Sequence, residues 1–151
     1  MHDIHQAIEV LRDITGQPDL AFGPGENVEV VFDGTPVGFV ATGRHHFELV
    51  TPLASLAATH DQATLTRLMT ANYLGTATGA ARLAFDPGRK QVALCERLDL
   101  RALDAGGLRE RIADFLGTAA FWNGPAGREA AAGPTTSGPD LSARDHFLIR
   151  G

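Results

Sequence analysis

Histidine and cysteine are the residues of this chain with the clearest potential for metal or nucleophilic chemistry. Six histidines and a single cysteine, Cys95, are present. His2 and His5 are three residues apart near the start of the chain, whereas His45 and His46 are adjacent and would point to opposite faces of a strand. Histidine metal sites usually show short spacings such as His-Glu-x-x-His, which this sequence lacks. We therefore expect no metal site and no cofactor.

A catalytic thiol, a phosphate-binding loop and a serine nucleophile are not indicated either. Cys95 falls in a segment expected to be a strand and has no partner thiol, so it is expected to be a small buried hydrophobic residue. The glycine-containing segment 75–80 lacks the Gly-Lys-Ser/Thr ending of a P-loop. No serine lies in a Gly-x-Ser-x-Gly context. The sequence thus favours a protein that binds a partner over an enzyme.

The composition is that of one folded, acidic domain. The 151 residues are 44% hydrophobic, and thirteen Lys and Arg against eighteen Asp and Glu give a net charge of −5. A nucleic-acid binder needs a concentrated basic face, so this balance argues against one. No segment approaches the ~18 apolar residues of a membrane span, and the first residues do not resemble a secretory signal. We expect a cytoplasmic protein that binds neither nucleic acid nor membranes.

Three segments have apolar residues at helical spacing. They predict helices over about residues 3–15, 59–75 and 104–123. Asp3 and Thr59 are each followed three residues later by glutamine, as in a capping box, and Gly16 ends the first helix.

Alternating or β-branched segments predict five strands, over residues 28–32, 37–42, 46–51, 82–85 and 91–96. Asp33-Gly34 is a hairpin signal, and residues 86–90 form a second turn. Because short hairpins explain the strand pairing, no parallel crossover is required. The predicted fold is α+β, with an antiparallel sheet, helices packed on one face and the order α-β-β-β-α-β-β-α.

The domain is expected to end near residue 123. Residues 1–123 then form a single α+β domain, and residues 124–151, rich in Gly, Pro and Ala, form a flexible tail. The last apolar cluster of this tail, Phe147-Leu148-Ile149, is a candidate for docking onto the domain.

The stretch from Met69 to Pro87 resembles the central segment of the Tir chaperone (CesT-like) family, the class I chaperones of type III secretion. In that family a helix ends in Ala-Asn-aromatic/Leu-x-Gly, and Thr-Gly-Gly/Ala, an alternating strand and a turn follow. Segments 94–100 and 103–122 are similar to the family's second hairpin strand and closing helix. The resemblance covers about residues 3 to 123 and implies the same element order.

The resemblance implies a cytoplasmic homodimer without enzymatic activity. Such a chaperone binds the N-terminal segment of one or more secreted effectors and keeps it soluble and ready for export. A small α+β protein-binding or regulatory domain unrelated to secretion is the alternative that the residues leave open.

The resemblance also suggests which residues carry these contacts, with ordinary core packing as the alternative for each. The candidate dimer residues lie on the second helix: Leu65, Leu68, Met69 and Tyr73. The candidate effector-binding residues lie on the first helix and the first strands: Ile4, Ile8, Leu11, Val30, Phe32 and Phe39.

Overall fold

The structure is a computed structural model that describes residues 3–56 and 61–133. The main elements, in chain order, are α1 (Ile4–Thr15), β1 (Asn27–Phe32), β2 (Thr35–Ala41), β3 (His46–Pro52), α2 (Gln62–Asn72), β4 (Arg82–Asp86), β5 (Gln91–Asp99), α3 (Ala105–Asn123) and α4 (Pro125–Ala132). A short 3₁₀ turn, η2 (Tyr73–Gly75), continues α2.

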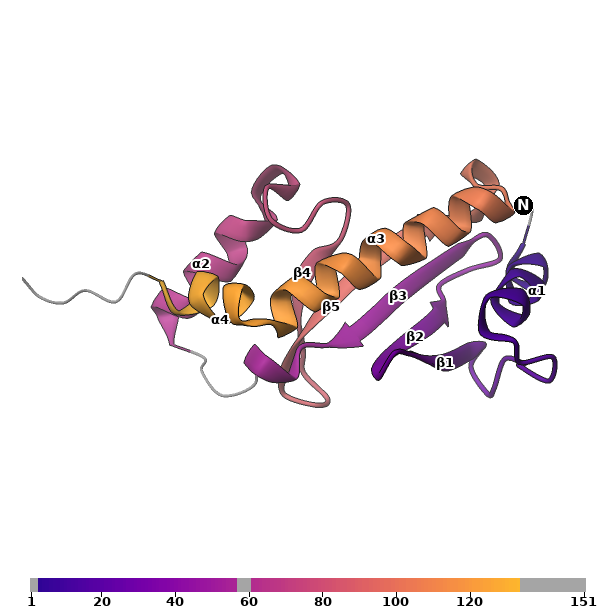
Figure 1. Ribbon diagram of the computed structural model, residues 1–151, viewed down its shortest axis with the longest axis horizontal. Helices are drawn as coiled ribbons and strands as arrows, with labels where there is room; N and C mark the ends of the chain where they lie inside the picture. Colours follow the sequence, from indigo (N-terminus) through magenta and orange to yellow (C-terminus); the bar gives the residue numbers. More distant parts are fainter. Residues whose placement is uncertain (1–2, 57–60, 134–151) are drawn as a thin grey trace, which may run out of the picture.

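The five strands form one antiparallel sheet in the order β1-β2-β3-β5-β4. The long helix α3 runs along one face of this sheet, with α1 near one end of it and α2 and α4 near the other (Figure 1). β4 lies at the edge of the sheet next to α2. The predicted α+β class and the antiparallel sheet are confirmed.

Local signals in the sequence explain where several elements begin and turn. Asp33 and Gly34 both have positive φ, 45° and 84°, as a two-residue type I′ hairpin requires. The side chains of Asp3 and Asp104 accept hydrogen bonds from backbone N–H groups in the first turns of α1 and α3. Gly16 ends α1 in the left-handed conformation.

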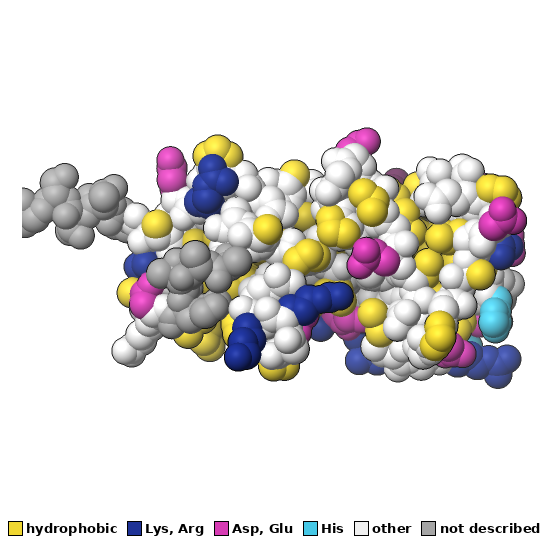
Figure 2. Space-filling model, turned by 90° about the horizontal axis from the view of Figure 1, so that it is seen from below, with side chains coloured by type: hydrophobic (Ala, Val, Ile, Leu, Met, Phe, Trp, Pro, Cys, Tyr) yellow, Lys and Arg dark blue, Asp and Glu magenta, His cyan; other side chains and the backbone are white. Residues whose placement is uncertain are grey.

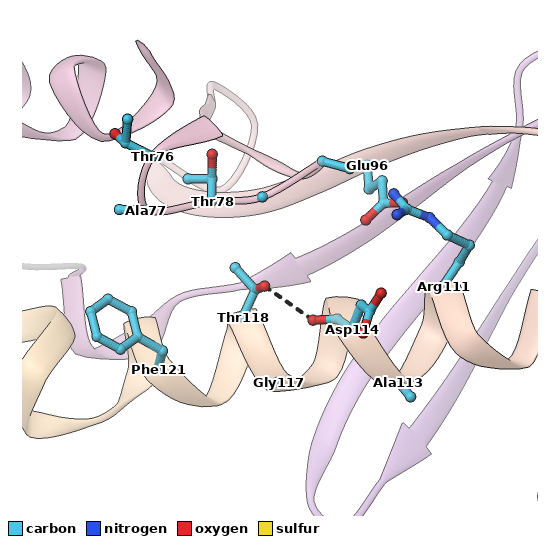
Figure 3. Close-up of a pocket in the computed structure, with 12 residues that line it drawn as sticks. Thr76, Ala77, Thr78, Glu96, Arg111, Ala113, Asp114, Gly117, Thr118 and Phe121 are labelled. Carbon is cyan, nitrogen blue, oxygen red and sulfur yellow. Dashed lines mark hydrogen bonds and ion pairs between the residues drawn. The ribbon is translucent and has the colours of Figure 1, made fainter. Parts of the chain in front are cut away.

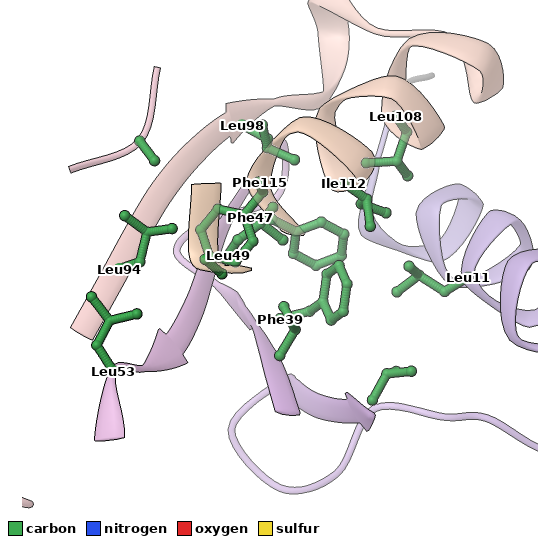
Figure 4. Packing of buried hydrophobic residues seen from close by; sticks show 14 of the residues in the cluster. Leu11, Phe39, Phe47, Leu49, Leu53, Leu94, Leu98, Leu108, Ile112 and Phe115 are labelled. Carbon is green, nitrogen blue, oxygen red and sulfur yellow. The ribbon is translucent and has the colours of Figure 1, made fainter. Parts of the chain in front are cut away.

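The core lies between the sheet and the helices α1 and α3. Phe39 of β2 and Phe47 of β3 are fully buried, and their ring centroids are 6.2 Å apart in an edge-to-face arrangement. Leu11 of α1 and Phe115 of α3 close over the same strands (Figure 4). Packing of the two helices against one sheet face therefore holds this end of the molecule together.

Two predictions about element boundaries differ from the structure. The N-cap of α2 is Asp61, whose Oδ1 accepts a hydrogen bond from the Thr64 backbone N–H at 2.9 Å; the expected cap, Thr59, lies outside the described residues. The sequence predicts a flexible tail over residues 124–151, but Pro125–Ala132 of this segment form the helix α4. Proline at the first helical position and packing against α2 and α3 explain this helix. The cluster at 147–149 lies outside the described residues.

Candidate interaction surfaces

An exposed apolar area covers α2, η2 and β4. Met69 and Leu74 are 73% and 84% exposed, far more than is usual for such side chains. We call this area the α2–β4 surface; its members are Leu65, Met69, Tyr73, Leu74 and Phe85. Clustered aromatic, methionine and leucine side chains of this kind are typical of protein–protein contacts.

A hollow of about 230 Å³ lies within the α2–β4 surface. Leu65 and Met69 form one wall from α2, Phe85 and Ala84 form the other from β4, and Leu68 is part of the lining. The lining is almost wholly apolar, so the hollow suits a hydrophobic side chain of a partner.

Asn72 holds the two elements of this surface together. Its Nδ2 donates to the Leu83 carbonyl at 3.0 Å, and its Oδ1 accepts from the Leu83 N–H at 2.7 Å. The amide thus pairs with the edge strand β4 as a neighbouring strand would. These two bonds fix the end of α2 relative to Phe85.

The outward face of α2 carries no charge. Arg67 is the one charged residue between Gln62 and Asn72, and its Nε donates to the Ala131 carbonyl of α4 at 2.6 Å, away from the α2–β4 surface. A solvated helix face usually carries charged side chains, so this face is chemically suited to being covered.

The predicted dimer residues divide into two groups. Leu65, Met69 and Tyr73 belong to the α2–β4 surface, whereas Leu68 is only 5% exposed and packs into the core. The prediction missed Leu74 and Phe85. A sequence signal existed for Phe85. It lies two residues after Leu83, on the same face of the predicted strand, and it faces Val92 across the hairpin.

Five of the six candidate effector-binding residues are core residues. Phe32 is half-buried, and its ring lies 6.4 Å from that of Phe39. Its neighbour Val31 is exposed. The buried five pack against one another and the sheet, so they offer almost no surface to a partner: Ile4, Ile8, Leu11, Val30 and Phe39. In the structure these five side chains make core contacts. Their role in effector binding stays a prediction.

A larger hollow, of about 790 Å³, lies between α3 and the loop that precedes β4 (Figure 3). Thr76 and Thr78 line it from the loop, Arg111 and Asp114 line it from α3, and Glu96 reaches it from β5. The close-up shows the Arg111 guanidinium against the Glu96 carboxylate. This hollow was not predicted from the sequence.

Glu96 is only 2% exposed, and burial raises the pKa of its carboxyl group above the usual range, while the ion pair with Arg111 acts in the opposite direction. A carboxylate already held by an arginine is a poor general base. The residues that line the hollow include no cysteine or histidine that could act beside it.

The histidine and cysteine candidates do not converge in the structure. His46 is the β3 partner of Asp99, and Val50 is the β3 partner of Cys95. His46 and Cys95 are therefore four positions apart along the ladder, or about 13 Å. Burial raises the pKa of the Cys95 thiol. Within residues 3–56 and 61–133, no group of three or more His, Cys, Asp or Glu side chains is placed to bind a metal ion.

The surface shown in Figure 2 is mixed in character. Lys and Arg side chains are interspersed with Asp and Glu, and hydrophobic side chains form several separate groups. In the described part of the chain, none of the helices combines the length and apolar character needed to cross a membrane.

Several solved structures share this fold. The ExsC–ExsE complex matches with a TM-score of 0.64 and 16% identity, covering 80% of this chain and 94% of that chain. The HopA1–SchA chaperone–effector complex matches with a TM-score of 0.62 and 15% identity, covering 76% and 88%. The Yersinia pestis type III secretion chaperone SycH, in complex with a fragment of YscM2, matches with a TM-score of 0.59 and 15% identity, covering 76% and 95%. These likenesses establish the fold.

Comparison at the level of sequence gives the family. A search of curated proteins finds no match. The model of the Tir chaperone protein (CesT) family matches residues 6–123, which span most of α1 and every later element through α3. The resemblance seen in the sequence is thereby confirmed, and this chain belongs to the Tir chaperone (CesT) family.

Proposed function

We propose that this type III secretion chaperone acts in the cytoplasm as a homodimer, without enzymatic activity, and binds the N-terminal segment of a secreted effector. The exposed, uncharged α2–β4 surface is the observation that carries the dimer. In a symmetric dimer the same surface of both copies meets around a two-fold axis. The protruding side chains Met69 and Leu74 of one copy can then fill the apolar hollow of the other.

Effector binding is supported by the family and by neighbours of the same fold. The HopA1–SchA structure is described as a chaperone–effector complex, and SycH is bound to a fragment of a second protein. Extended segments bind such folds by placing apolar side chains on exposed apolar area or by adding to a sheet edge. The exposed Val31 and the half-buried Phe32 on the edge strand β1 are the candidates for this contact.

The dimer is tested by measuring mass in solution by light scattering during size-exclusion chromatography. Met69→Asp places a charge in the apolar hollow and is expected to give folded monomers. Ala63→Asp is the matched control, because Ala63 is exposed on α2 and lies about 200° around the helix from Leu65. A dimer that survives Met69→Asp, or is lost equally in both variants, contradicts the assignment of the α2–β4 surface.

Effector binding is tested in two steps. The tagged full chain is purified from its native cells, and co-purifying proteins are identified by mass spectrometry. Each secreted candidate is then produced with and without its N-terminal segment, and binding is measured by calorimetry. Binding that requires this segment, at two chaperones per effector, is expected. Equal binding of the shortened effector contradicts the proposal.

A further inference from the structure

The helix α4 lies outside the part of the chain that the family model matches, yet it contacts both α2 and α3. We propose that α4 holds α2 in the position from which the α2–β4 surface meets a second copy of this chain. This inference rests on the proposed dimer and names an element that sets its geometry.

The first support is the close approach of α4 to the end of α3. A Cβ at Gly127 would lie 2.5 Å from the Trp122 Cα and 2.6 Å from the Phe121 carbonyl oxygen. Such distances are too short for any side chain, so only glycine allows α4 to pack here. Trp122 itself is fixed, because it is buried and its Nε1 donates to the Ala77 carbonyl at 3.1 Å.

The second support is the contact of α4 with α2. The Arg67 Nε donates to the Ala131 carbonyl in the last turn of α4, where the helix dipole favours a cation. The Arg67 guanidinium also lies against Gly133, where an added Cβ would be 2.9 Å from Nη1. Arg67 therefore joins the middle of α2 to the C-terminal end of α4.

The third support is that α2 has few attachments apart from α4 and the two bonds of Asn72 to β4. Only Thr64 and Leu68 of its eleven residues are buried. With 100° of rotation per residue, Thr64, Arg67 and Ala71 share the side of α2 that lies opposite Leu65 and Met69. Contact of α4 with the side that carries Arg67 thus sets the rotation of α2, and with it the position of Leu65 and Met69 on the α2–β4 surface.

The test compares two glycine-to-alanine variants of the full chain. Gly127→Ala introduces the clash described above, whereas Gly117→Ala, also in a helix, adds a Cβ with nothing within 4 Å. We expect Gly127→Ala to raise the dimer dissociation constant at least tenfold. It should also speed amide hydrogen exchange of α2 at least tenfold, with β3 and β5 unchanged. Gly117→Ala should leave both measurements as in the wild type.

Arg67→Leu tests the same inference without a clash in α4. It removes the hydrogen bond to Ala131 and keeps an apolar side chain of moderate size. Arg109→Leu is its control, because Arg109 is an exposed arginine of α3. Faster exchange of α2 and a weaker dimer are expected for Arg67→Leu alone. This pair decides the question if Gly127→Ala does not fold.

The outcomes separate the two proposals. A wild type that is monomeric at all concentrations refutes the proposed dimer, whatever α2 does. A dimeric wild type whose dissociation constant is unchanged by Gly127→Ala and by Arg67→Leu overturns the role of α4 and leaves the dimer standing. Exchange that rises in every strand, and not selectively in α2, also overturns it, because α4 would then support the whole fold.

Discussion

Replacement of Asn72 separates α2 from β4 at one defined point. Both hydrogen bonds of its amide go to Leu83, one to the N–H at 2.7 Å and one to the carbonyl at 3.0 Å. Asn72→Ala removes both and leaves the two backbone groups of a half-covered edge strand without these partners.

The magnitude follows from the number of bonds. A hydrogen bond contributes about 0.5–1.5 kcal/mol net, so the loss of two predicts a decrease of about 1–3 kcal/mol in the free energy of unfolding. At this chain length each kcal/mol lowers Tm by about 2–4 °C. Urea and thermal unfolding, monitored by circular dichroism at one fixed protein concentration, measure the decrease.

Asn72→Asp distinguishes the hydrogen bonds from simple packing. An ionised carboxylate can accept from the Leu83 N–H but cannot donate to its carbonyl, whereas the protonated acid satisfies both groups. Folding therefore raises the pKa of the introduced carboxyl above its unfolded value of about 3.9. The stability this group contributes is complete below the unfolded pKa and is lost as pH rises through the folded pKa.

The pH profile of the two variants gives the decisive comparison. The stability difference between wild type and Asn72→Asp should shrink as pH falls from 7 to 4, while the difference for Asn72→Ala should stay constant. A pH-independent difference for Asn72→Asp, or a decrease below about 0.5 kcal/mol for Asn72→Ala, would refute the reasoning.

Three further predictions concern the larger hollow, the core and the α2–β4 surface. Because burial raises the pKa of Glu96, the free energy of unfolding falls as pH rises from the unfolded pKa of about 4.3 through the folded pKa. Glu96→Gln should remove this pH dependence, which urea titrations between about pH 4 and 8 would measure. Arg111→Met should destabilise the protein by about 3 kcal/mol at pH 7, and less at pH 5, because it leaves a buried carboxylate without its partner. Leu68→Ala should cost about 2–5 kcal/mol of unfolding free energy and Met69→Ala under about 1 kcal/mol, when both are compared at concentrations where the protein is monomeric.

Features encoded by adjacent residues could be predicted from the sequence. Asp33-Gly34 predicts its hairpin because both positions must adopt positive φ, and Asp104 predicts the start of α3 because its side chain caps the first turn. The order of elements follows from such local signals together with the periodicity of the apolar residues.

Features that depend on how elements are placed against each other could not be predicted. Leu68 and Met69 are neighbours of similar type, and only the rotation of α2 against β4 buries one and exposes the other. The pairing of Asn72 with β4 could not be predicted, because both groups that it binds belong to Leu83, eleven residues further along the chain. The helix α4 has a polar, alanine-rich sequence, and the close approach at Gly127 that anchors it is invisible until α3 is in place.

The pairing of Asn72 with β4 also bears on edge-to-edge association of the sheet. An outer strand with unpaired N–H and carbonyl groups is a template on which identical chains can stack edge to edge into fibres. At Leu83 both groups are already occupied by a side chain, so an incoming strand would find the ladder interrupted at the second of its five residues. The edge strand β4 is therefore a poor template for edge-to-edge pairing, although an apolar surface lies beside it.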